Sequence, residues 1–237
     1  YVLKNSKNII SINPFVNKNL GNLIKGKIFN VENCIPESFF DYSLKKKQSN
    51  NILKLVFVGT IEPRKGVLDL LLACVKLKDS SIDFSLDIIG SVPSNYSDYF
   101  NKIKEIVDQK LNKSNIKFHG HLPQNEIANL VFNSSALILP SFEETAPMVI
   151  SEAMALGTIV ISTKVAGIPW MIDDKVTGLL FTPGNYEELF SKIFFILEAS
   201  EENIRMSKKA RLKSEKLYHP NMVADKTYSV YKEIIGK

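Results

Sequence analysis

Short apolar runs and helix-like segments alternate six times between residues 53 and 199. Runs such as 55–58 (Leu-Val-Phe-Val) and 159–161 (Ile-Val-Ile) are apolar at every position, which is typical of strands buried on both faces. The expected strands are 53–58, 84–89, 116–118, 136–139, 158–162 and 179–181. Strand and helix alternating in this way predicts an α/β fold, a Rossmann-like doubly wound parallel sheet with helices on both faces.

Helical patterns fill the gaps between these strands and continue to the C-terminus. We expect helices at 66–78, 96–111, 123–133, 147–156, 186–199, 202–217 and 222–235, with a helical turn at 168–172. His219 and Pro220 separate the last two helices. The last helix carries an apolar stripe, so it should dock on another surface: Met222, Val223, Tyr228, Tyr231, Ile234 and Ile235.

The first 50 residues have a different pattern. Two short strands are expected at 8–13 and 27–31, each followed by polar sequence. Residues 31–51 contain Pro36, three consecutive lysines and an Asn/Ser-rich end, which is the composition of a linker. A domain boundary near Asn50 is therefore predicted.

Composition excludes several classes of protein. With 237 residues and 45% hydrophobic content, the chain can fill a packed core. The net charge of +5 comes from scattered lysines and short clusters at 45–47 and 208–213, without a basic stripe interleaved with aromatics, so no nucleic-acid partner is expected. Cys34 and Cys74 have no nearby Cys or His to complete a metal set, and reduced thiols in the cytoplasm are expected. No run approaches the ~20 apolar residues of a transmembrane segment, and no signal peptide is visible.

The expected sheet indicates where a ligand would bind. Doubly wound sheets commonly have the strand order 3-2-1-4-5-6, and ligands lie beyond the carboxyl ends of strands 1 and 4, where the order reverses. The loops at that point are 59–66 and 140–147, and loop 163–169 borders the same crevice.

The first loop has phosphate-binding chemistry. Arg64 and Lys65 precede a helix whose N-terminus favours anions, and Gly59 and Gly66 allow close backbone approach. A solvated turn before a helix is the alternative reading of the same residues. Convergence with the second loop favours a bound phosphate or diphosphate.

The second loop and its helix carry two glutamates. Pro147 opens the expected helix and Gly157 can close it, with Glu144 in the loop above and Glu152 one turn below the first backbone N–H groups. A solvated loop and an ordinary helix glutamate are the alternative. Glu152, however, has apolar neighbours and would need a partner if buried: Ile150, Ala153 and Met154. Cations at one lip and carboxylates at the other suit a sugar nucleotide.

Several familiar sites are absent from the sequence. There is no Gly-x-x-x-x-Gly-Lys-Ser/Thr, no Gly-x-Gly-x-x-Gly after the first strand, and no Asp-x-Asp; Asp173-Asp174 are adjacent in a turn. We therefore expect no metal and no cofactor, with the diphosphate charge met by Arg64, Lys65 and helix N-termini. His119 and His121 should point to opposite sides of the strand end, in structural or base-contacting roles, and His219 should mark a helix boundary. No Ser-His-Asp or Cys-His set can be assembled.

Four segments carry a family resemblance. Segments 57–66 (Phe-Val-Gly-Thr-Ile-Glu-Pro-Arg-Lys-Gly), 116–122, 139–157 (with Glu-Glu-Thr-Ala-Pro and Glu-Ala-Met-Ala-Leu-Gly) and 176–184 resemble the C-terminal, donor-binding domain of retaining GT-B glycosyltransferases of family four, the glycosyl transferases group 1. The resemblance covers residues 50–218. It implies two Rossmann-like domains that transfer a sugar from a nucleotide diphosphate, UDP or GDP, with retention and without metal. Polysaccharide or glycan biosynthesis is the expected setting.

The resemblance assigns roles by position. It implies that Glu144 is the catalytic residue beside the donor sugar, that Glu152 holds the ribose hydroxyls and that Lys65 binds the diphosphate. The other implied donor-binding positions are Gly59, Thr60 and Arg64 in the first loop, Gly120, His121 and Leu122 beside the nucleotide base, and the backbone of Ala146, Pro147, Met148 and Val149.

The chain departs from the family pattern at three places. Thr60 stands where the family often has Arg, and we hypothesise that Arg64 supplies the second cation. Ala146-Pro147 replaces Phe-Gly, and Trp170 replaces the usual Glu after Gly-x-Pro.

The resemblance also implies a domain organisation. Residues 1–35 are expected to be the end of a truncated N-terminal domain, 36–50 a linker, 51–218 the nucleotide-sugar-binding domain, and 219–237 a helix that packs on the N-terminal domain. Since that domain normally carries the acceptor site, we expect weak donor binding and little transferase activity from this chain alone. Expected partners are the donor, the N-terminal domain, and an acceptor sugar or lipid-linked glycan, the last compatible with a peripheral membrane location.

Two other functions fit the same residues. A non-catalytic nucleotide-sugar-binding module would keep the fold and use the crevice for recognition, and Thr60 favours it. A GT-B sugar-nucleotide epimerase or phosphorylase is the third reading.

Overall fold

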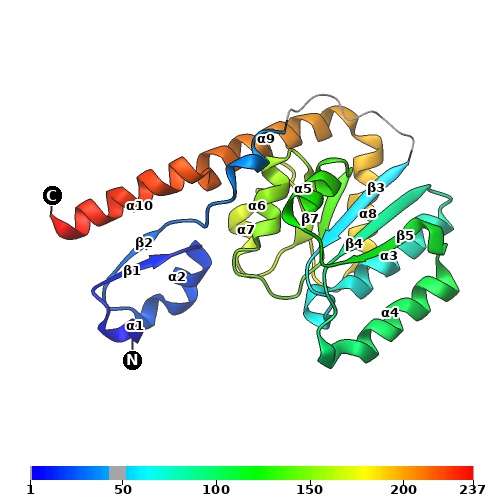
Figure 1. Ribbon diagram of the computed structural model, residues 1–237, viewed down its shortest axis with the longest axis horizontal. Helices are drawn as coiled ribbons and strands as arrows, with labels where there is room; N and C mark the ends of the chain where they lie inside the picture. The colour runs from blue at the N-terminus through cyan, green and yellow to red at the C-terminus, as the bar shows by residue number, and fades with distance from the viewer. Residues whose placement is uncertain (1, 43–51, 237) are drawn as a thin grey trace.

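The computed structural model describes residues 2–42 and 52–236 and contains a six-stranded sheet (Figure 1). All neighbouring strands are parallel, and their order is β5-β4-β3-β6-β7-β8. The strands are β3 (Leu53–Val58), β4 (Phe84–Ile89), β5 (Ile116–Gly120), β6 (Ala136–Leu139), β7 (Ile159–Thr163) and β8 (Leu179–Phe181). This is the expected 3-2-1-4-5-6 order, and the predicted α/β doubly wound fold is confirmed.

Helices cover both faces of the sheet, and each face has its own set. On one face α3 packs against α4 and α8; on the other, α6 packs against α5 and α9 (Figure 1). The helices are α3 (Val67–Asp79), α4 (Ser97–Lys110), α5 (Gln124–Phe132), α6 (Met148–Ala155), α7 (Ile168–Met171), α8 (Tyr186–Glu198) and α9 (Ser200–Tyr218). Each expected helix is present, with ends displaced by one or two residues.

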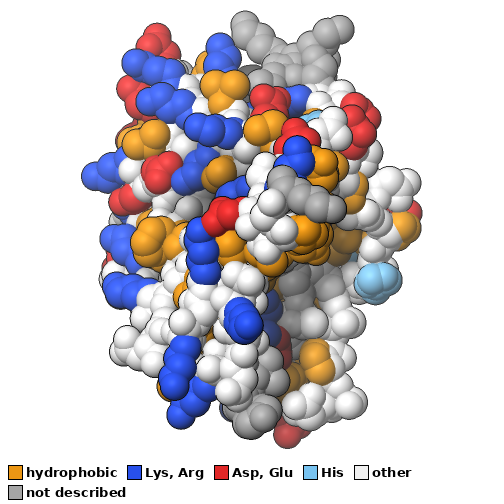
Figure 2. Space-filling model, turned by 90° about the vertical axis from the view of Figure 1, so that its left-hand side faces the viewer, with side chains coloured by type: hydrophobic (Ala, Val, Ile, Leu, Met, Phe, Trp, Pro, Cys, Tyr) orange, Lys and Arg blue, Asp and Glu red, His pale blue; other side chains and the backbone are white. Residues whose placement is uncertain are grey.

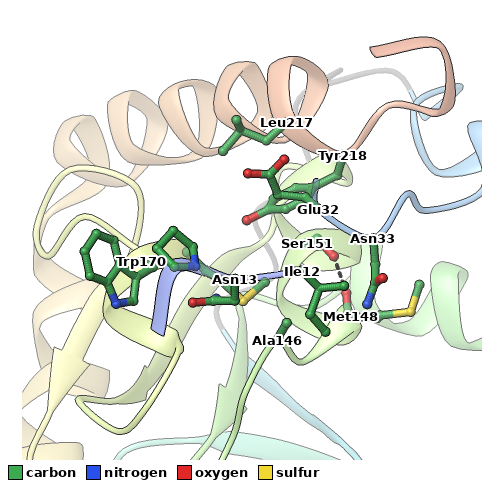
Figure 3. A pocket seen from close by; sticks show the side chains of 12 residues that line it. Ile12, Asn13, Glu32, Asn33, Ala146, Met148, Ser151, Trp170, Leu217 and Tyr218 are labelled. Atoms are coloured by element: carbon green, nitrogen blue, oxygen red, sulfur yellow. Dashed lines mark hydrogen bonds between the residues drawn. The ribbon is translucent and has the colours of Figure 1, made fainter. Parts of the chain in front are cut away.

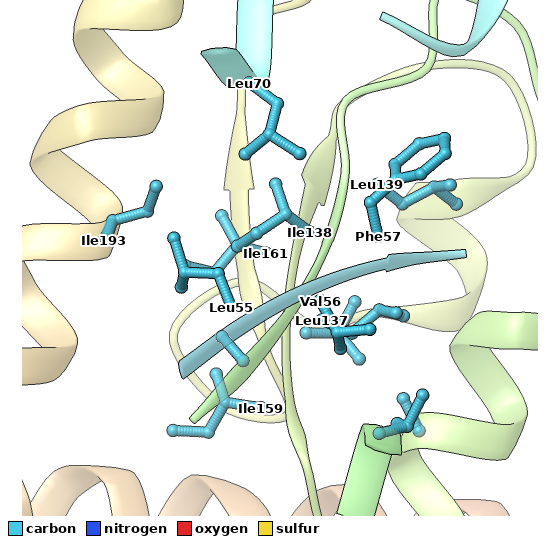
Figure 4. Close-up of a cluster of buried hydrophobic side chains, with 14 of the residues drawn as sticks. Leu55, Val56, Phe57, Leu70, Leu137, Ile138, Leu139, Ile159, Ile161 and Ile193 are labelled. Atoms are coloured by element: carbon cyan, nitrogen blue, oxygen red, sulfur yellow. The ribbon is translucent and has the colours of Figure 1, made fainter. Parts of the chain in front are cut away.

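The core lies between the sheet and these helices. Leu55, Ile138 and Ile161 from three adjacent strands are fully buried, and Leu70 of α3 and Ile193 of α8 approach them (Figure 4). Every residue of β6 and β7 is buried. Burial on both faces explains why these strands have no alternation of polar and apolar residues.

The N-terminal segment, residues 2–42, forms a small separate sheet. Strands β1 (Asn8–Ser11) and β2 (Lys27–Asn30) pair in parallel, with α1 (Val2–Asn5) and α2 (Pro14–Leu20) beside them. Helix α2 was not expected from its polar sequence. The side chain of Asn13 accepts a hydrogen bond from the Phe15 N–H, and Pro14 occupies the first turn, so the signal was the Asn-Pro pair.

The first part of the expected linker is packed into the main core. Ile35 and Phe39 are 1% and 2% exposed, and Phe39 ends the short 3₁₀ helix Glu37–Phe39. This part of the expected linker is therefore anchored, because Ile35 just before it and Phe39 within it are buried in the core. The rest of the expected linker and the boundary near Asn50 lie outside the described residues, and the domain limits stay a prediction.

The last helix, α10 (Pro220–Ile235), runs from the main domain along the N-terminal segment (Figure 1). His219 accepts a hydrogen bond from the Asn221 N–H at its start, which confirms the expected boundary role. Lys226 pairs with Glu32 at 2.6 Å, and Lys27 pairs with Glu233. On this side of the molecule, Lys and Arg side chains lie among hydrophobic ones (Figure 2).

The apolar stripe of α10 stays largely exposed in this structure. Val230 is the only residue of the helix that is buried among those described. The exposed members include Met222, Tyr228, Tyr231 and Ile235. Across the described residues, no helix combines the length and the apolarity that a membrane crossing needs.

Candidate functional site

Three loops meet beyond the carboxyl ends of β3, β6 and β7. The Phe142 N–H donates to the Arg64 carbonyl at 2.8 Å, which joins the β6–α6 loop to the β3–α3 loop. The Gly167 N–H donates to the Glu144 carbonyl at 2.9 Å, which joins the β7–α7 loop to the same place. The convergence expected from the strand order is therefore present.

Glycine is required where these loops touch. Gly66 has φ +70°, and a Cβ on it would lie 2.1 Å from the Pro140 carbonyl oxygen. A Cβ on Gly167 would lie 1.7 Å from the Thr145 carbonyl oxygen. These approaches leave no room for a side chain, so the backbones of the three loops pack directly against one another.

Lys65 and Glu144 form an ion pair at the centre of the site. The Lys65 Nζ lies 2.5 Å from Glu144 Oε1, and the Ser141 hydroxyl donates to the same oxygen at 2.9 Å. The two side chains are only 15% and 9% exposed. The cation and the carboxylate come from the two opposing loops, as expected, and the loops approach closely enough for direct contact between them.

Arg64 is the more exposed cation and is held by a neighbouring carboxylate. Its Nη2 donates to Glu62 Oε1 at 2.8 Å, and its Nη1 donates to the Glu143 carbonyl at 3.2 Å. The Thr60 hydroxyl donates to the same Glu62 oxygen at 2.8 Å. Sequence reasoning missed Glu62; the signal was an acid between Gly59 and Arg64, two residues from each partner.

These groups line an open pocket of about 420 Å³. Arg64, Glu143 and Glu144 supply its polar wall, and Ile12, Thr145 and Ala146 complete it. The pocket thus combines a partly exposed guanidinium with two acidic residues, which suits a polar ligand with both anionic and hydroxyl groups.

Glu152 lies on α6, away from this pocket and facing α5. Burial raises the pKa of its carboxyl group, and a side-chain hydrogen bond with Gln124 acts in the opposite direction. Gln124, the first residue of α5, was not foreseen from the sequence. A half-buried carboxylate whose main partner is a neutral amide still has acceptor capacity for a ligand.

The N-terminus of α6 has no side-chain cap. Pro147 occupies the capping position, and Met148, the first helical residue, is 40% exposed. Val149 packs partly against the core. The start of this helix therefore offers backbone N–H groups at the surface beside Ala146.

The residues expected to contact the nucleotide base lie at the end of β5. Gly120 has φ +67° with open space at its Cβ position, and its carbonyl accepts from the Gly90 N–H at 2.8 Å. His121 is exposed, while His119 is largely buried and contacts Asp87 at 2.6 Å. The two histidines thus point to different environments, as expected. Neither Gly120, His121 nor Leu122 lines the 420 Å³ pocket.

A metal-binding cluster is absent from the part of the chain that the structure describes. No three His, Cys, Asp or Glu side chains there are grouped so that they could hold a metal ion. Cys34 is exposed, Cys74 is buried, and both are free thiols.

The chain matches known proteins over most of its length. A family model described as Glycosyl transferases group 1 matches residues 40–213. The uncharacterized glycosyltransferase MJ1178 of Methanocaldococcus jannaschii is 29% identical over 205 residues, covering 85% of this chain and 52% of that protein. The amylovoran biosynthesis glycosyltransferase AmsK of Erwinia amylovora is 27% identical over 187 residues, covering 76% of this chain and 44% of that protein. The chain thus spans about half the length of these relatives.

Solved structures share the fold. A glycosyltransferase from Rickettsia africae superposes with a TM-score of 0.85 at 24% identity, covering 97% of this chain and 64% of that one. HepE from Anabaena, solved in complex with UDP-glucose, superposes with a TM-score of 0.81 at 16% identity, covering 100% of this chain and 65% of that one. The fold is that of GT-B glycosyltransferases.

Proposed function

Because the chain belongs to the glycosyl transferases group 1 family, we propose that it is the donor-binding half of a retaining enzyme that transfers a sugar from a nucleotide diphosphate to an acceptor hydroxyl. The observation that carries the proposal is the Lys65–Glu144 pair at the strand-order reversal, beside an open polar pocket. This pair supports the proposal because it brings a cation, suited to a diphosphate, next to a carboxylate, suited to sugar hydroxyls.

In this proposal the diphosphate competes with Glu144 for Lys65. Without ligand, the charge of Lys65 is neutralised by the carboxylate at 2.5 Å. A diphosphate offers more negative charge and turns the ammonium toward itself, with Arg64 as the second cation in place of the arginine that Thr60 replaces. Glu144 is then free to accept hydrogen bonds from the donor sugar, which makes it the proposed catalytic residue.

The rest of the donor follows from the positions around α6. We assign the phosphates and sugar to the backbone of Ala146, Pro147, Met148 and Val149 and to Gly59 and Thr60. We assign the ribose hydroxyls to Glu152, whose carboxyl pKa is raised by burial and whose oxygens can accept further hydrogen bonds beside the one from Gln124. Gly120, His121 and Leu122 would meet the base.

The chemistry needs no group beyond the donor and the acceptor in this proposal. The acceptor oxygen forms a bond to the anomeric carbon on the face that the diphosphate leaves, which retains the configuration. The carbon–oxygen bond to the diphosphate breaks, its electron pair leaves with the diphosphate, and the acceptor proton passes to the leaving oxygen. Lys65, Arg64 and the start of α6 stabilise the charge that develops there, so we propose a metal-independent reaction without a cofactor.

Calorimetric titration with UDP, GDP and ADP tests the donor site. We expect heat of binding with UDP or GDP, and a loss of that heat in Lys65→Met. A chain that is folded by circular dichroism and gives no heat with any of the three nucleotides would count against a donor site.

The acceptor and the transfer step require more than this chain in our proposal. Since the chain spans about half of its relatives, we propose that an N-terminal domain carries most of the acceptor site and that this chain alone has little transferase activity. The relative AmsK is named for amylovoran biosynthesis, and we propose a polysaccharide or lipid-linked glycan as the acceptor class.

A non-catalytic binding module is the second candidate, and the Glu62 contacts favour it. The Glu62 carboxylate accepts hydrogen bonds from both the Thr60 hydroxyl and the Arg64 guanidinium, so the charge of the guanidinium is already partly neutralised. In that case nucleotide would bind but an enzyme with the complete acceptor domain would not consume the donor. Incubating such an enzyme with the donor and measuring release of nucleoside diphosphate distinguishes the two functions.

A further inference from the structure

Ser141 is a fully buried serine in the loop between β6 and α6, beside the candidate site. Its hydroxyl donates a hydrogen bond at 2.9 Å to Oε1 of Glu144, the same oxygen that the Lys65 ammonium contacts at 2.5 Å. The Glu144 side chain is only 9% exposed, so water has little access to it. Ser141 is thus a second donor to this carboxylate, beside the lysine.

Two neighbouring buried hydroxyl groups have a different kind of partner. Ser162 is as completely buried as Ser141, and its hydroxyl donates to the Leu139 carbonyl at 2.7 Å. The Ser151 hydroxyl donates to the Met148 carbonyl within α6, on the wall of a small pocket of about 70 Å³ (Figure 3). Both bonds satisfy backbone carbonyls, which need a partner wherever they are buried. Donation to a charged side chain sets Ser141 apart from these two serines.

Thr163 fixes the backbone that carries Ser141. It is the last residue of β7, it is fully buried, and its hydroxyl donates to the Ser141 carbonyl at 2.6 Å. The ladder between β6 and β7 ends at the pair Leu139 and Ser162, so this side-chain bond continues the connection into the loop. A chain of contacts therefore runs from the sheet through Ser141 to Glu144.

A bound diphosphate would act differently on the two donors to Glu144. In the proposed function its negative charge draws the Lys65 ammonium away from the carboxylate. Ser141 is uncharged and does not line the open pocket, so the ligand does not displace its hydroxyl. A nearly buried carboxylate without any donor is unfavourable. A donor that stays in place therefore makes the release of Lys65 easier.

We propose that Ser141, held by Thr163, is a positioning residue that keeps the Glu144 carboxylate in place when the diphosphate binds Lys65. It acts through Glu144 and makes no contact with the ligand. Oε1 of the carboxylate stays with the hydroxyl, which leaves Oε2 to accept a hydrogen bond from the donor sugar. This inference rests on the proposed function, because it takes the loops around Lys65 as the diphosphate site.

The affinity for a nucleoside diphosphate tests this role. The full chain is titrated with UDP and with GDP by calorimetry, and the tighter binder is used for every variant. Ser141→Ala should weaken binding about three- to tenfold, because the release of Lys65 then leaves Glu144 without a donor.

Ser162→Ala is the matched control for Ser141→Ala. It also removes a fully buried hydroxyl and leaves a buried acceptor without its donor, but it does not touch Glu144. It should bind the nucleotide as tightly as the unmodified chain. Equal weakening in the two variants would show a general effect on the loops, and the positioning role would be wrong.

A double-mutant cycle tests whether Ser141 acts through Glu144. In a Glu144→Gln chain the uncharged amide does not hold the Lys65 ammonium, so Ser141→Ala should cause no further change in nucleotide affinity. The same fold loss in both backgrounds would mean that Ser141 acts on the ligand by another route, which overturns the proposal.

The hydroxyl of Thr163 can be removed and restored. Thr163→Val keeps the β-branched shape and loses the bond to the Ser141 carbonyl, so it should weaken nucleotide binding in the same direction as Ser141→Ala but less. Thr163→Ser keeps a hydroxyl and should recover most of the affinity. Unchanged affinity in Thr163→Val would overturn the part assigned to Thr163.

Thermal unfolding without nucleotide separates this inference from the proposed function. Lys65→Met removes the other donor to Glu144, so Ser141→Ala should lower the melting temperature more in that background than in the unmodified chain. Ser162→Ala should lower it equally in both. Such coupling in a chain that gives no heat with UDP, GDP or ADP would refute the donor function while supporting Ser141 as the residue that holds Glu144. Additive losses in a chain that binds nucleotide would overturn the role of Ser141 alone.

Discussion

The ion pair between Lys65 and Glu144 has two opposing roles in the proposed cycle. Without ligand it keeps two largely buried charges compensated, with Ser141 as a third partner. With ligand it competes with the diphosphate for the ammonium group. The same contact therefore stabilises the fold and lowers the affinity for the donor.

Glu144→Gln should separate these two effects. The substitution leaves Lys65 without its anionic partner, so we expect a loss of about 1–3 kcal/mol in the free energy of unfolding. It also removes a charge that repels the diphosphate, so we expect UDP to bind several-fold more tightly by calorimetry. Transfer by an enzyme with its complete acceptor domain should fall steeply.

Lys65→Met provides the complementary control. It should also reduce stability, but UDP binding should weaken rather than strengthen. If Glu144→Gln and Lys65→Met changed UDP affinity in the same direction, the competition between carboxylate and diphosphate would be disproved.

Glu152 makes stability depend on pH in a definite direction. Burial raises the pKa of its carboxyl in the folded chain, so the folded state holds this proton more tightly than the unfolded state. The resulting stabilisation is complete below the ordinary glutamate pKa and is lost as the pH rises through the folded-state pKa. At neutral pH the buried, charged carboxylate therefore lowers the free energy of unfolding.

Glu152→Gln should therefore raise the melting temperature at neutral pH and not at acidic pH. A gain of 1 kcal/mol would appear as about 2–4 °C for a domain of this size. UDP binding should weaken in the same variant, because an amide accepts ribose hydroxyls less well than a carboxylate. A melting-temperature gain that is equal at acidic and neutral pH would show that burial of the charge is not its cause.

At the scale of elements, the sheet could be predicted because its strands are buried on both sides. Six apolar runs gave all six strands, and the common order of doubly wound sheets then placed loops 59–66 and 140–147 side by side. Helix α2 could not be recognised by periodicity, since it has no buried residue and depends on its Asn13 cap. Glu62 and Gln124 were missed because their contacts depend on how the loops and helices fold against each other.

The loop packing itself is testable at Gly66. Alanine there faces both the positive φ of +70° and the Pro140 carbonyl oxygen 2.1 Å from its Cβ. We expect a loss of about 2–4 kcal/mol in unfolding free energy and weaker UDP binding, because the β6–α6 loop must move. Chemical denaturation and calorimetry measure the two effects.

Alanine substitutions at two other glycines distinguish the effect of backbone strain from the effect of a steric clash. Gly236 has φ +75° and open space around it, so Gly236→Ala reports backbone strain alone, whereas Gly21 is helical with open space and should tolerate alanine. A loss in Gly66→Ala no greater than in Gly236→Ala would mean that the contact with Pro140 is easily relieved.

At the scale of the whole molecule, the N-terminal segment is joined to the main domain by a few long-range contacts. The Ile35 N–H donates to the Tyr218 carbonyl at 3.1 Å, and Arg211 donates to the Phe40 and Tyr42 carbonyls. Local sequence gave no sign of these contacts, since each joins residues more than 150 positions apart. Composition alone therefore suggested a linker where the chain is partly anchored.

One of these contacts reaches the candidate site. The Asn13 amide, 3% exposed, donates to the Gly167 carbonyl at 3.2 Å, and the Gly167 N–H donates to the Glu144 carbonyl. The N-terminal segment is thus two hydrogen bonds away from the loop that carries the proposed catalytic residue. A change in how this segment docks should be felt at Glu144.

Asn13→Asp tests this connection without removing the cap of α2. Aspartate still accepts the Phe15 N–H, but it cannot donate to Gly167 and sets a carboxylate against its carbonyl. We expect faster hydrogen exchange in β1 and in residues 164–167, with β6 and β7 unchanged, because the main core does not depend on this contact. Asn19→Ala, whose amide bonds only the Phe15 carbonyl within α2, should leave residues 164–167 protected. Equal exchange in both variants at these residues would mean that the segment docks independently of the site.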